Sequence, residues 1–315
     1  MSSYTALKSL DEAAMRTRIL LWPPKAGVWI RIAVIALFLG GFMMNPFKSD
    51  LISAPDPDTF LQPGLMSGYE SVIISLIIVL MAGLLFYVLL SSIFQFVFVD
   101  CISSGTILIG RTFRNRMGKG LHLLLFYLCM LLLIIIASGI VVVFVILPVF
   151  LDGPLVLLTL LVHLIMALVI LLILLIPVWI LAILTADFVV PLMIREDCGI
   201  IDGWNYLIQI FSGRWVEAMI YTGVKIILSI IAGIILGVIV GLITILLDLP
   251  ASIIGSQGVH EGISDKTVML LIASTCVVCV ISLFLLVPVI TFFRYYSLIM
   301  LKELDTRYDF LTPNP

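Results

Sequence analysis

Four ionisable residues lie near the ends of long apolar segments and are the first candidates for chemistry in this chain. They are Asp100, Asp187, Lys225 and Arg294. Counting about 1.5 Å of rise per helical residue places all four near one boundary of a hydrocarbon layer about 30 Å thick. Ionisable groups at membrane depth are functional candidates by default and need partners. The spacing predicts a charged cluster at this boundary, with Lys225–Asp187 or Arg294–Asp100 as ion pairs.

Three roles are open for this cluster. The ion pairs could lock helices together, because removing one partner of a buried pair is costly. The basic side chains could instead reach lipid headgroups, since long cationic side chains extend to the interface. The third role is a path for ions or protons.

Other residue patterns with chemical precedent do not predict a reaction. His163 has no obvious carboxylate partner in its apolar segment, so a packed core histidine is favoured over a proton relay. Cys276 and Cys279 form a C-x-x-C without a second pair or a nearby histidine, which disfavours zinc and redox use. Residues 105–112 resemble a phosphate-binding loop, yet no globular nucleotide fold follows them. The sequence predicts no enzyme, catalytic residue, cofactor or metal site.

The elements that position these residues follow from composition. Of 315 residues, 63% are hydrophobic and 11% are charged, against roughly 45–50% apolar and 25% charged in soluble domains. So few polar residues cannot coat a water-soluble globule of this size, and the net charge of −2 gives no basic excess for nucleic acid. The sequence predicts an all-α, polytopic integral membrane helix bundle.

Six apolar segments are expected to cross the membrane within a single transmembrane domain, residues 1–315. Their bounds are about 27–44, 72–99, 121–150, 155–193, 218–247 and 268–293. The fourth is too long for one straight crossing, because roughly 39 residues make a helix of about 58 Å. Pro177 could divide it into two helices, which would give seven spans and an external C-terminus. We favour a single kinked helix whose last turns protrude beyond the membrane.

The positions of basic residues predict the orientation. Of the 17 lysines and arginines, all but Lys48 and Lys266 fall on one side of the six expected spans. Loops that stay in the cytoplasm retain lysine and arginine. We therefore expect a multi-pass protein of the cell membrane with its N- and C-termini in the cytoplasm.

A short amphipathic helix is expected on the inner membrane surface over residues 9–22. Ser9 and Glu12 fit a capping box, and Pro23 prevents the helix from continuing past Trp22. A second helix of this kind is expected over residues 200–212.

The fifth apolar segment carries small residues at intervals of four. They are Ser229, Gly233, Gly237 and Gly241. Small residues at this spacing let two helix backbones approach closely, and a repeated G-x-x-x-G is typical of tight packing in membranes. The sequence predicts that another helix packs against this face.

Several short motifs resemble those of a known membrane protein family. The motifs are Leu10-Asp11-Glu12-Ala13, Thr17-Arg18, Trp22-Pro23, residues 38–41, residues 187–191, Gly203-Trp204 and residues 293–296. They resemble an uncharacterised archaeal multi-pass membrane family with a domain of unknown function, related to the membrane domain attached to some glycerophosphodiester phosphodiesterases. The resemblance implies an archaeal cell-membrane protein with about six helices and implies no activity. The phosphodiesterase catalytic domain is absent from this sequence.

Two functions follow as hypotheses. A non-enzymatic membrane scaffold or accessory subunit fits the glycine-rich helix and the basic inner face, with membrane lipids and a membrane protein or second copy as partners and no nucleic acid. The alternative is a small transporter or channel with a polar site near Lys225, Asp187 and Arg294, since Pro177 and Pro288 could interrupt helices. A membrane-embedded lipid enzyme would need polar residues inside the spans, where they are nearly absent.

Overall fold

The computed structural model describes residues 5–41, 70–104, 109–146, 157–256 and 265–311, and within these ranges the chain forms helices and no strand. The all-α fold predicted from the sequence is confirmed for these residues. The elements are α1 (Thr5–Leu21), α2 (Ala26–Ala36), the π-turn η1 (Leu37–Gly41), α4 (Glu70–Ser104), α5 (Ile109–Val141), the π-turn η4 (Val142–Ile146), α7 (Leu157–Leu184), the π-turn η5 (Thr185–Val189), α8 (Val190–Arg195), α9 (Ile200–Phe211), α10 (Trp215–Ser256), α11 (Asp265–Leu304) and the short 3-10 turn η6 (Thr306–Tyr308).

Five helical stretches among the described residues are long and apolar enough to cross a membrane, so the expected count of six is not confirmed. They are Ser71–Ser104, Ile109–Val145, Leu161–Arg195, Trp215–Leu249 and Met269–Leu304. The expected first span, 27–44, begins instead with the 11-residue α2. Such a helix covers about 16 Å, roughly half of a hydrocarbon core, and Gly40 leaves the helical path with a φ of 118°. Residues 42–44 of that expected span lie outside the described residues.

The long fourth apolar segment, 155–193, is one helix rather than two over its described part, 157–193. Pro177 lies inside α7 without ending it, and the helix continues through η5 into α8. The preference for a single helix is therefore confirmed there. The irregular point is η5, where a π-turn inserts a residue and changes the direction of the side chains that follow.

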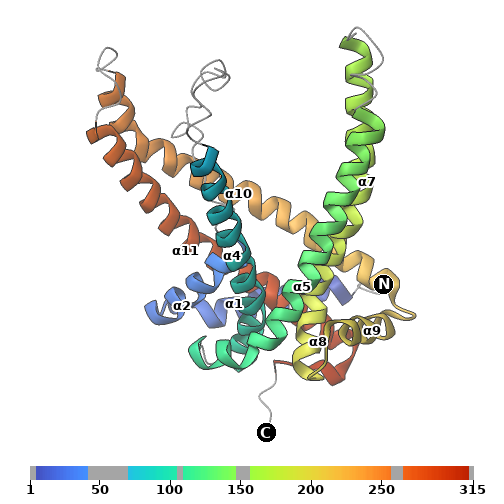
Figure 1. Ribbon diagram of the computed structural model, residues 1–315. Coiled ribbons are helices and arrows are strands. Elements are labelled where there is room, and N and C mark those ends of the chain that lie inside the picture. The colour runs from blue at the N-terminus through green and yellow to red at the C-terminus, as the bar shows by residue number, and fades with distance from the viewer. Residues whose placement is uncertain (1–4, 42–69, 105–108, 147–156, 257–264, 312–315) are drawn as a thin grey trace.

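The helices pack together at one end of the molecule and diverge toward the other. Figure 1 shows the α5–α7 pair and the α10–α11 pair leaning apart, with α4 between them. α1 and α2 both contact α11 at the packed end. We call this packed end the base; it contains residues 5–22, 92–102, 109–124, 185–225 and 286–310. The first helix and the C-terminal end of α11 therefore lie at the same end of the protein.

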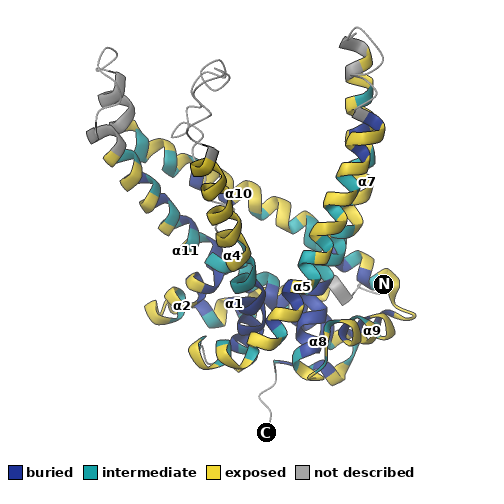
Figure 2. Cartoon of the chain, in the orientation of Figure 1, coloured by how far each residue is buried: buried dark blue, intermediate teal, exposed yellow. Residues whose placement is uncertain are grey.

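Within a single helix, residues at the base are buried and residues in the diverging part are exposed. In α4, residues 92–99 are all buried, whereas residues 71–86 are all exposed, and Figure 2 shows this contrast between the base and the diverging helices. The largest fully buried side chains of the base are aromatic: Phe96, Phe98, Phe188, Phe211, Tyr221 and Tyr296. Exposed leucine and isoleucine are stable in a bilayer because lipid tails are as apolar as they are. The main hydrophobic core therefore lies at the base.

The N-terminal helix belongs to this core and is not only a surface helix. It begins at Thr5, so Ser9 lies inside the helix and is not the N-cap that the capping box predicted. The buried face, which packs against α11, consists of Ser9, Ala13, Thr17 and Leu21. The second expected surface helix, 200–212, is observed as α9 (Ile200–Phe211) and packs against η5 and α8.

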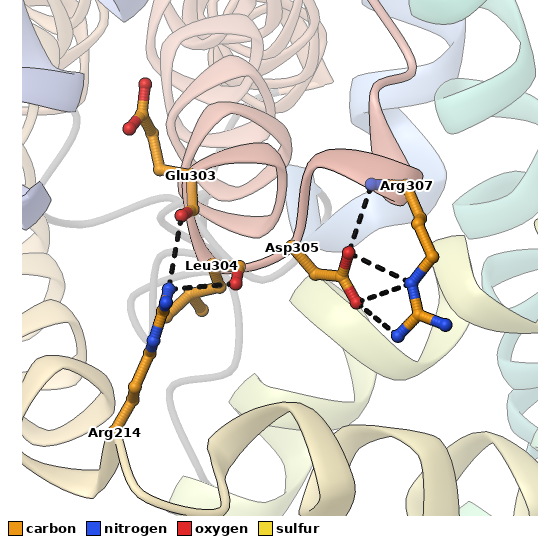
Figure 3. Close-up of polar contacts among 5 residues, drawn as sticks. All are labelled: Arg214, Glu303, Leu304, Asp305 and Arg307. Carbon is orange, nitrogen blue, oxygen red and sulfur yellow. Dashed lines mark hydrogen bonds and ion pairs between the residues drawn. The ribbon is translucent and has the colours of Figure 1, made fainter.

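The C-terminal end of α11 is fixed by polar contacts that Figure 3 shows. The Nη1 atom of Arg214 donates to the carbonyl of Leu304 at 2.9 Å, which satisfies a carbonyl that the helix end leaves without an intrahelical partner. Beyond the helix, the Asp305 carboxylate accepts from the Arg307 backbone N–H at 3.0 Å and from its Nη2 at 2.6 Å. The Arg214 contact joins the end of α11 to the turn before α10, and the Asp305–Arg307 contacts fix the conformation of the segment that follows α11.

Asp305→Asn is expected to lower thermal stability slightly at neutral pH. The hydrogen bonds from Arg307 lower the pKa of the Asp305 carboxyl below its usual value. A lowered folded-state pKa stabilises above the unfolded-state pKa, about 3.9 for aspartate, and this stabilisation is lost as pH falls through the folded value. The difference in Tm between wild type and variant, followed from pH 7 downward, should therefore shrink in acid. A difference that grows in acid would contradict the assignment.

Candidate functional site

The π-turn η5 positions the central residue of the candidate site, Asp187. This residue is buried, with 5% of its surface exposed. Facing it is α10, which carries Tyr221 and Lys225 one helical turn apart and therefore on the same face. The third element is α11, which contributes Arg294, 7% exposed.

An ion pair joins η5 to α10. The Lys225 Nζ atom donates to the Asp187 Oδ2 atom, and the Tyr221 hydroxyl donates to the same oxygen at 2.9 Å. The Lys225 side chain is 15% exposed, and its ammonium lies 5.9 Å from the ring centroid of Phe293. The Lys225–Asp187 pair predicted from the sequence is therefore present in the structure, with Tyr221 as an additional donor.

Arg294 bonds to the same turn through the backbone. Its Nη1 atom donates to the Ala186 carbonyl at 2.8 Å. Its guanidinium carbon lies 5.5 Å from the ring centroid of Phe98, on α4. Arg294 thus connects α11 to η5 and to α4, and it does not pair with Asp100 as predicted.

Asp100 has a different partner, which corrects the alternative pair Arg294–Asp100. Arg116 binds its carboxylate with two hydrogen bonds, from Nε at 2.7 Å and from Nη2 at 3.1 Å. The reason is that α5 begins at Ile109, well before the expected span start at residue 121, so its first turns lie opposite the end of α4. Of the four predicted residues, three meet around η5 and Asp100 belongs to a separate α4–α5 contact.

Aromatic rings surround the ion pair. Tyr221 lies 4.8 Å from Phe188 and 4.8 Å from Tyr296, measured between ring centroids. The Tyr296 hydroxyl is buried and has no hydrogen-bond partner among the described residues. Such a shell lowers the local dielectric, which strengthens the attraction of a paired charge and raises the cost of an unpaired one. The arrangement is suited to holding α10, α11 and η5 together.

Lys119, on α5, also binds near the ion pair: it joins α5 to the end of α8. Its ammonium donates to the Met193 carbonyl and forms an ion pair of 2.6 Å with Asp197. The hydrogen bond from Lys119 lowers the pKa of the Asp197 carboxyl. Sequence reasoning assigned Lys119 only to a cytoplasmic loop, because nothing in the local pattern indicates a contact 74 residues away.

The glycine stripe of α10 does not form the predicted close contact. A methyl group built on Gly233, Gly237 or Gly241 would meet no atom within 4 Å, and Ser229 is exposed. No helix of the described chain packs closely on this face, so tight packing against another helix stays a prediction. Close packing occurs instead at Gly120, where such a methyl would lie 2.5 Å from Ile93 Cγ1, and at Gly203.

The remaining sequence candidates lie away from the ion pair. The His163 Nδ1 atom is 2.8 Å from the Thr159 carbonyl, one turn earlier in α7, and the side chain is only half-buried, so it is not the packed core histidine that was expected. Cys276 and Cys279 are free cysteines on α11. The first residues of the loop 105–112 lie outside the described part of the chain.

These features define the class of protein: an all-helical protein with several helices able to span a membrane, joined at one end by a buried core with an ion pair. The chain belongs to a family of unknown function, DUF7544, whose family model matches residues 4–311. No curated protein matches the sequence, and no solved structure matches the fold.

Proposed function

We propose that this protein is a non-enzymatic membrane scaffold or accessory subunit. The observation that carries the proposal is a contrast: the ionisable groups are bonded within the protein, whereas the apolar helix faces are exposed. The ionisable groups at η5 bind one another and backbone carbonyls. In contrast, the diverging helices leave most of their most apolar stretches unburied. In a protein of this form, the exposed apolar helix faces can contact another membrane protein, while the ion pairs stabilise the fold.

The small-residue face of α10 is the surface we assign to that partner. Gly233 and Gly237 are exposed and have open space where a side chain would stand. Helix association in a bilayer depends on close van der Waals approach, which small residues at intervals of four permit. This face is therefore where another helix would gain most from contact.

The cellular location is part of the same proposal. We place the protein in the cell membrane with both termini in the cytoplasm. The shared position of α1 and the end of α11 at the base supports this orientation, as do the basic residues there, Arg116, Lys119, Arg195 and Arg214. An archaeal origin, and a relation to the membrane domain attached to some glycerophosphodiester phosphodiesterases, are what the motif resemblance adds.

The double variant Gly233→Ile/Gly237→Ile tests the role. It should fold normally, because neither new side chain meets an atom of the described chain within 4 Å at its Cβ, and it should lose a complex that wild type forms in native membranes. The measurement is cross-linking in membranes followed by a native gel, with Tm as the folding check. Gly83→Ile on α4, also in open space, is the matched control. Absence of any wild-type complex, or a complex that survives the double change, would contradict the proposal.

The second candidate, a small transporter, is favoured by two observations at the same place. Asp187 sits on a π-turn, a distortion that is frequent at functional sites, and Tyr296 leaves a buried hydroxyl without a partner in the described chain. Proton flux into vesicles containing purified protein, abolished by Asp187→Asn in folded protein, would favour transport over a scaffold.

A further inference from the structure

A groove of about 540 Å³ runs between α1 and the α10–α11 pair. Neither Lys225 nor Asp187 lines it, although one of its lining residues, Phe293, also lies against the Lys225 ammonium. Its walls are apolar side chains of the two long helices, including Ile231, Ala232 and Ile235 of α10 and Pro288 and Val289 of α11. This volume lies in the usual range for small-molecule sites, about 300–1,000 Å³.

The groove crosses the expected boundary of the membrane. Its α10 and α11 walls belong to stretches apolar and long enough to span the bilayer. Its other lining residues include Arg18 and Trp22, from α1 and the turn after it, which belong to the base. Tryptophan is enriched at the level of lipid headgroups, and Trp22 is 67% exposed. One end of the groove is therefore at headgroup level and the walls extend toward the lipid tails.

Arg18 supplies an available positive charge at the headgroup end. Its side chain is exposed and forms no ion pair within the described residues. The neighbouring cation on the same helix, Arg16, is already paired with Glu12 at 2.8 Å. Lys225 does not compete for a ligand either, since its ammonium binds Asp187.

We propose that this groove binds one anionic phospholipid, with its phosphate at Arg18 and an acyl chain along Ile231, Ile235 and Val289. Apolar walls favour methylene groups and disfavour a polar solute, which would lose its hydration without gaining hydrogen bonds. A guanidinium matches a phosphate because its donors can bond two oxygens at once. The site is independent of the scaffold role, because a lipid can bind here whether or not a partner occupies α10.

The test uses the full-length protein in phosphatidylcholine nanodiscs that contain phosphatidylglycerol with a photoactivatable group in its acyl chain. Mass spectrometry then maps the labelled residues. The variants are Arg18→Gln, which removes the charge, and Ala232→Phe, which fills the groove. The controls are Lys8→Gln on the same helix and Ile234→Phe on α10; neither position lines the groove, and both side chains are exposed. Tm is measured for every variant, so that misfolding is recognised.

The expected result is labelling concentrated on residues 228–235 and 288–293. Arg18→Gln should reduce it about fivefold, the usual contribution of one cation near an anionic surface. Ala232→Phe should reduce labelling at least as much, and both controls should match wild type. Uniform labelling of all apolar helix faces, equal labelling by a phosphatidylcholine probe, or cross-links from a second protein copy in the groove would each overturn the proposal.

Discussion

Lys225→Ala is expected to lower the free energy of unfolding by about 3–5 kcal/mol, the usual cost of removing one partner of a buried ion pair. The variant leaves the Asp187 carboxylate, 5% exposed, with only the Tyr221 hydroxyl as a side-chain partner. Arg294 cannot replace Lys225 as the partner of this carboxylate, because its guanidinium donates to the Ala186 carbonyl. The other side chains around the carboxylate are aromatic. The measurement is reversible unfolding of the purified protein in mild detergent.

A second substitution separates this cost from a general loss of packing. In Lys225→Met/Asp187→Asn both charges are removed while side-chain size is nearly kept, so most of the stability should return. Lys8→Ala, at an exposed position on α1, should change stability by less than about 0.5 kcal/mol. If the double variant is as unstable as Lys225→Ala, the ion pair is not what holds α10 to η5.

Gly120→Ala is expected to destabilise the protein by about 1–3 kcal/mol, the range found when a well-packed contact is overfilled. The new methyl would stand 2.5 Å from the Cγ1 atom and 3.1 Å from the Cα atom of Ile93. Because one of these atoms belongs to the backbone of α4, a side-chain rotation cannot relieve the overlap. The two helices must separate, which also disturbs the buried stretch 92–99 and the nearby Arg116–Asp100 contact.

Gly118→Ala provides the matched control for this change. It makes the same substitution two residues earlier in α5, where the new methyl would meet nothing within 4 Å. Alanine is favoured over glycine in a helix by up to about 1 kcal/mol, so this variant should be neutral or slightly more stable. Tm should therefore fall in Gly120→Ala and not in Gly118→Ala; a fall of similar size in both variants would show that the α4–α5 approach is not the cause.

The ion pair Lys225–Asp187 could be predicted from the sequence, whereas the partner of Asp100 could not. Lys225 and Asp187 stand near the ends of apolar runs, and counting residues along a helix gives their depth. Depth alone allowed Arg294 to be assigned to Asp100. The true partner, Arg116, depends on where α5 begins, and the polar residues before the expected span at 121 gave no sign that the helix already starts at Ile109.

The position of the close helix–helix contact could not be predicted from glycine spacing either. Regular spacing made Gly233, Gly237 and Gly241 the expected contact, yet the close approach is at Gly120, within the basic segment Arg116-Met117-Gly118-Lys119-Gly120. Spacing indicates that a close approach is permitted. Whether a neighbouring helix lies there depends on how the helices are directed from the base.

The sequence by itself determined that this chain is helical, that several helices are apolar and long enough to cross a membrane, and that Lys225 and Asp187 lie at a common depth. These properties follow from composition and from the fixed rise per residue, which are local. Only the tertiary structure decided that η5 turns Asp187 toward α10, that Arg116 binds Asp100, and that the apolar helices diverge above a packed base. Those outcomes depend on contacts between residues far apart in sequence. Among apolar helices in lipid, hydrophobicity favours no one arrangement, so it is the few polar and small residues that select it.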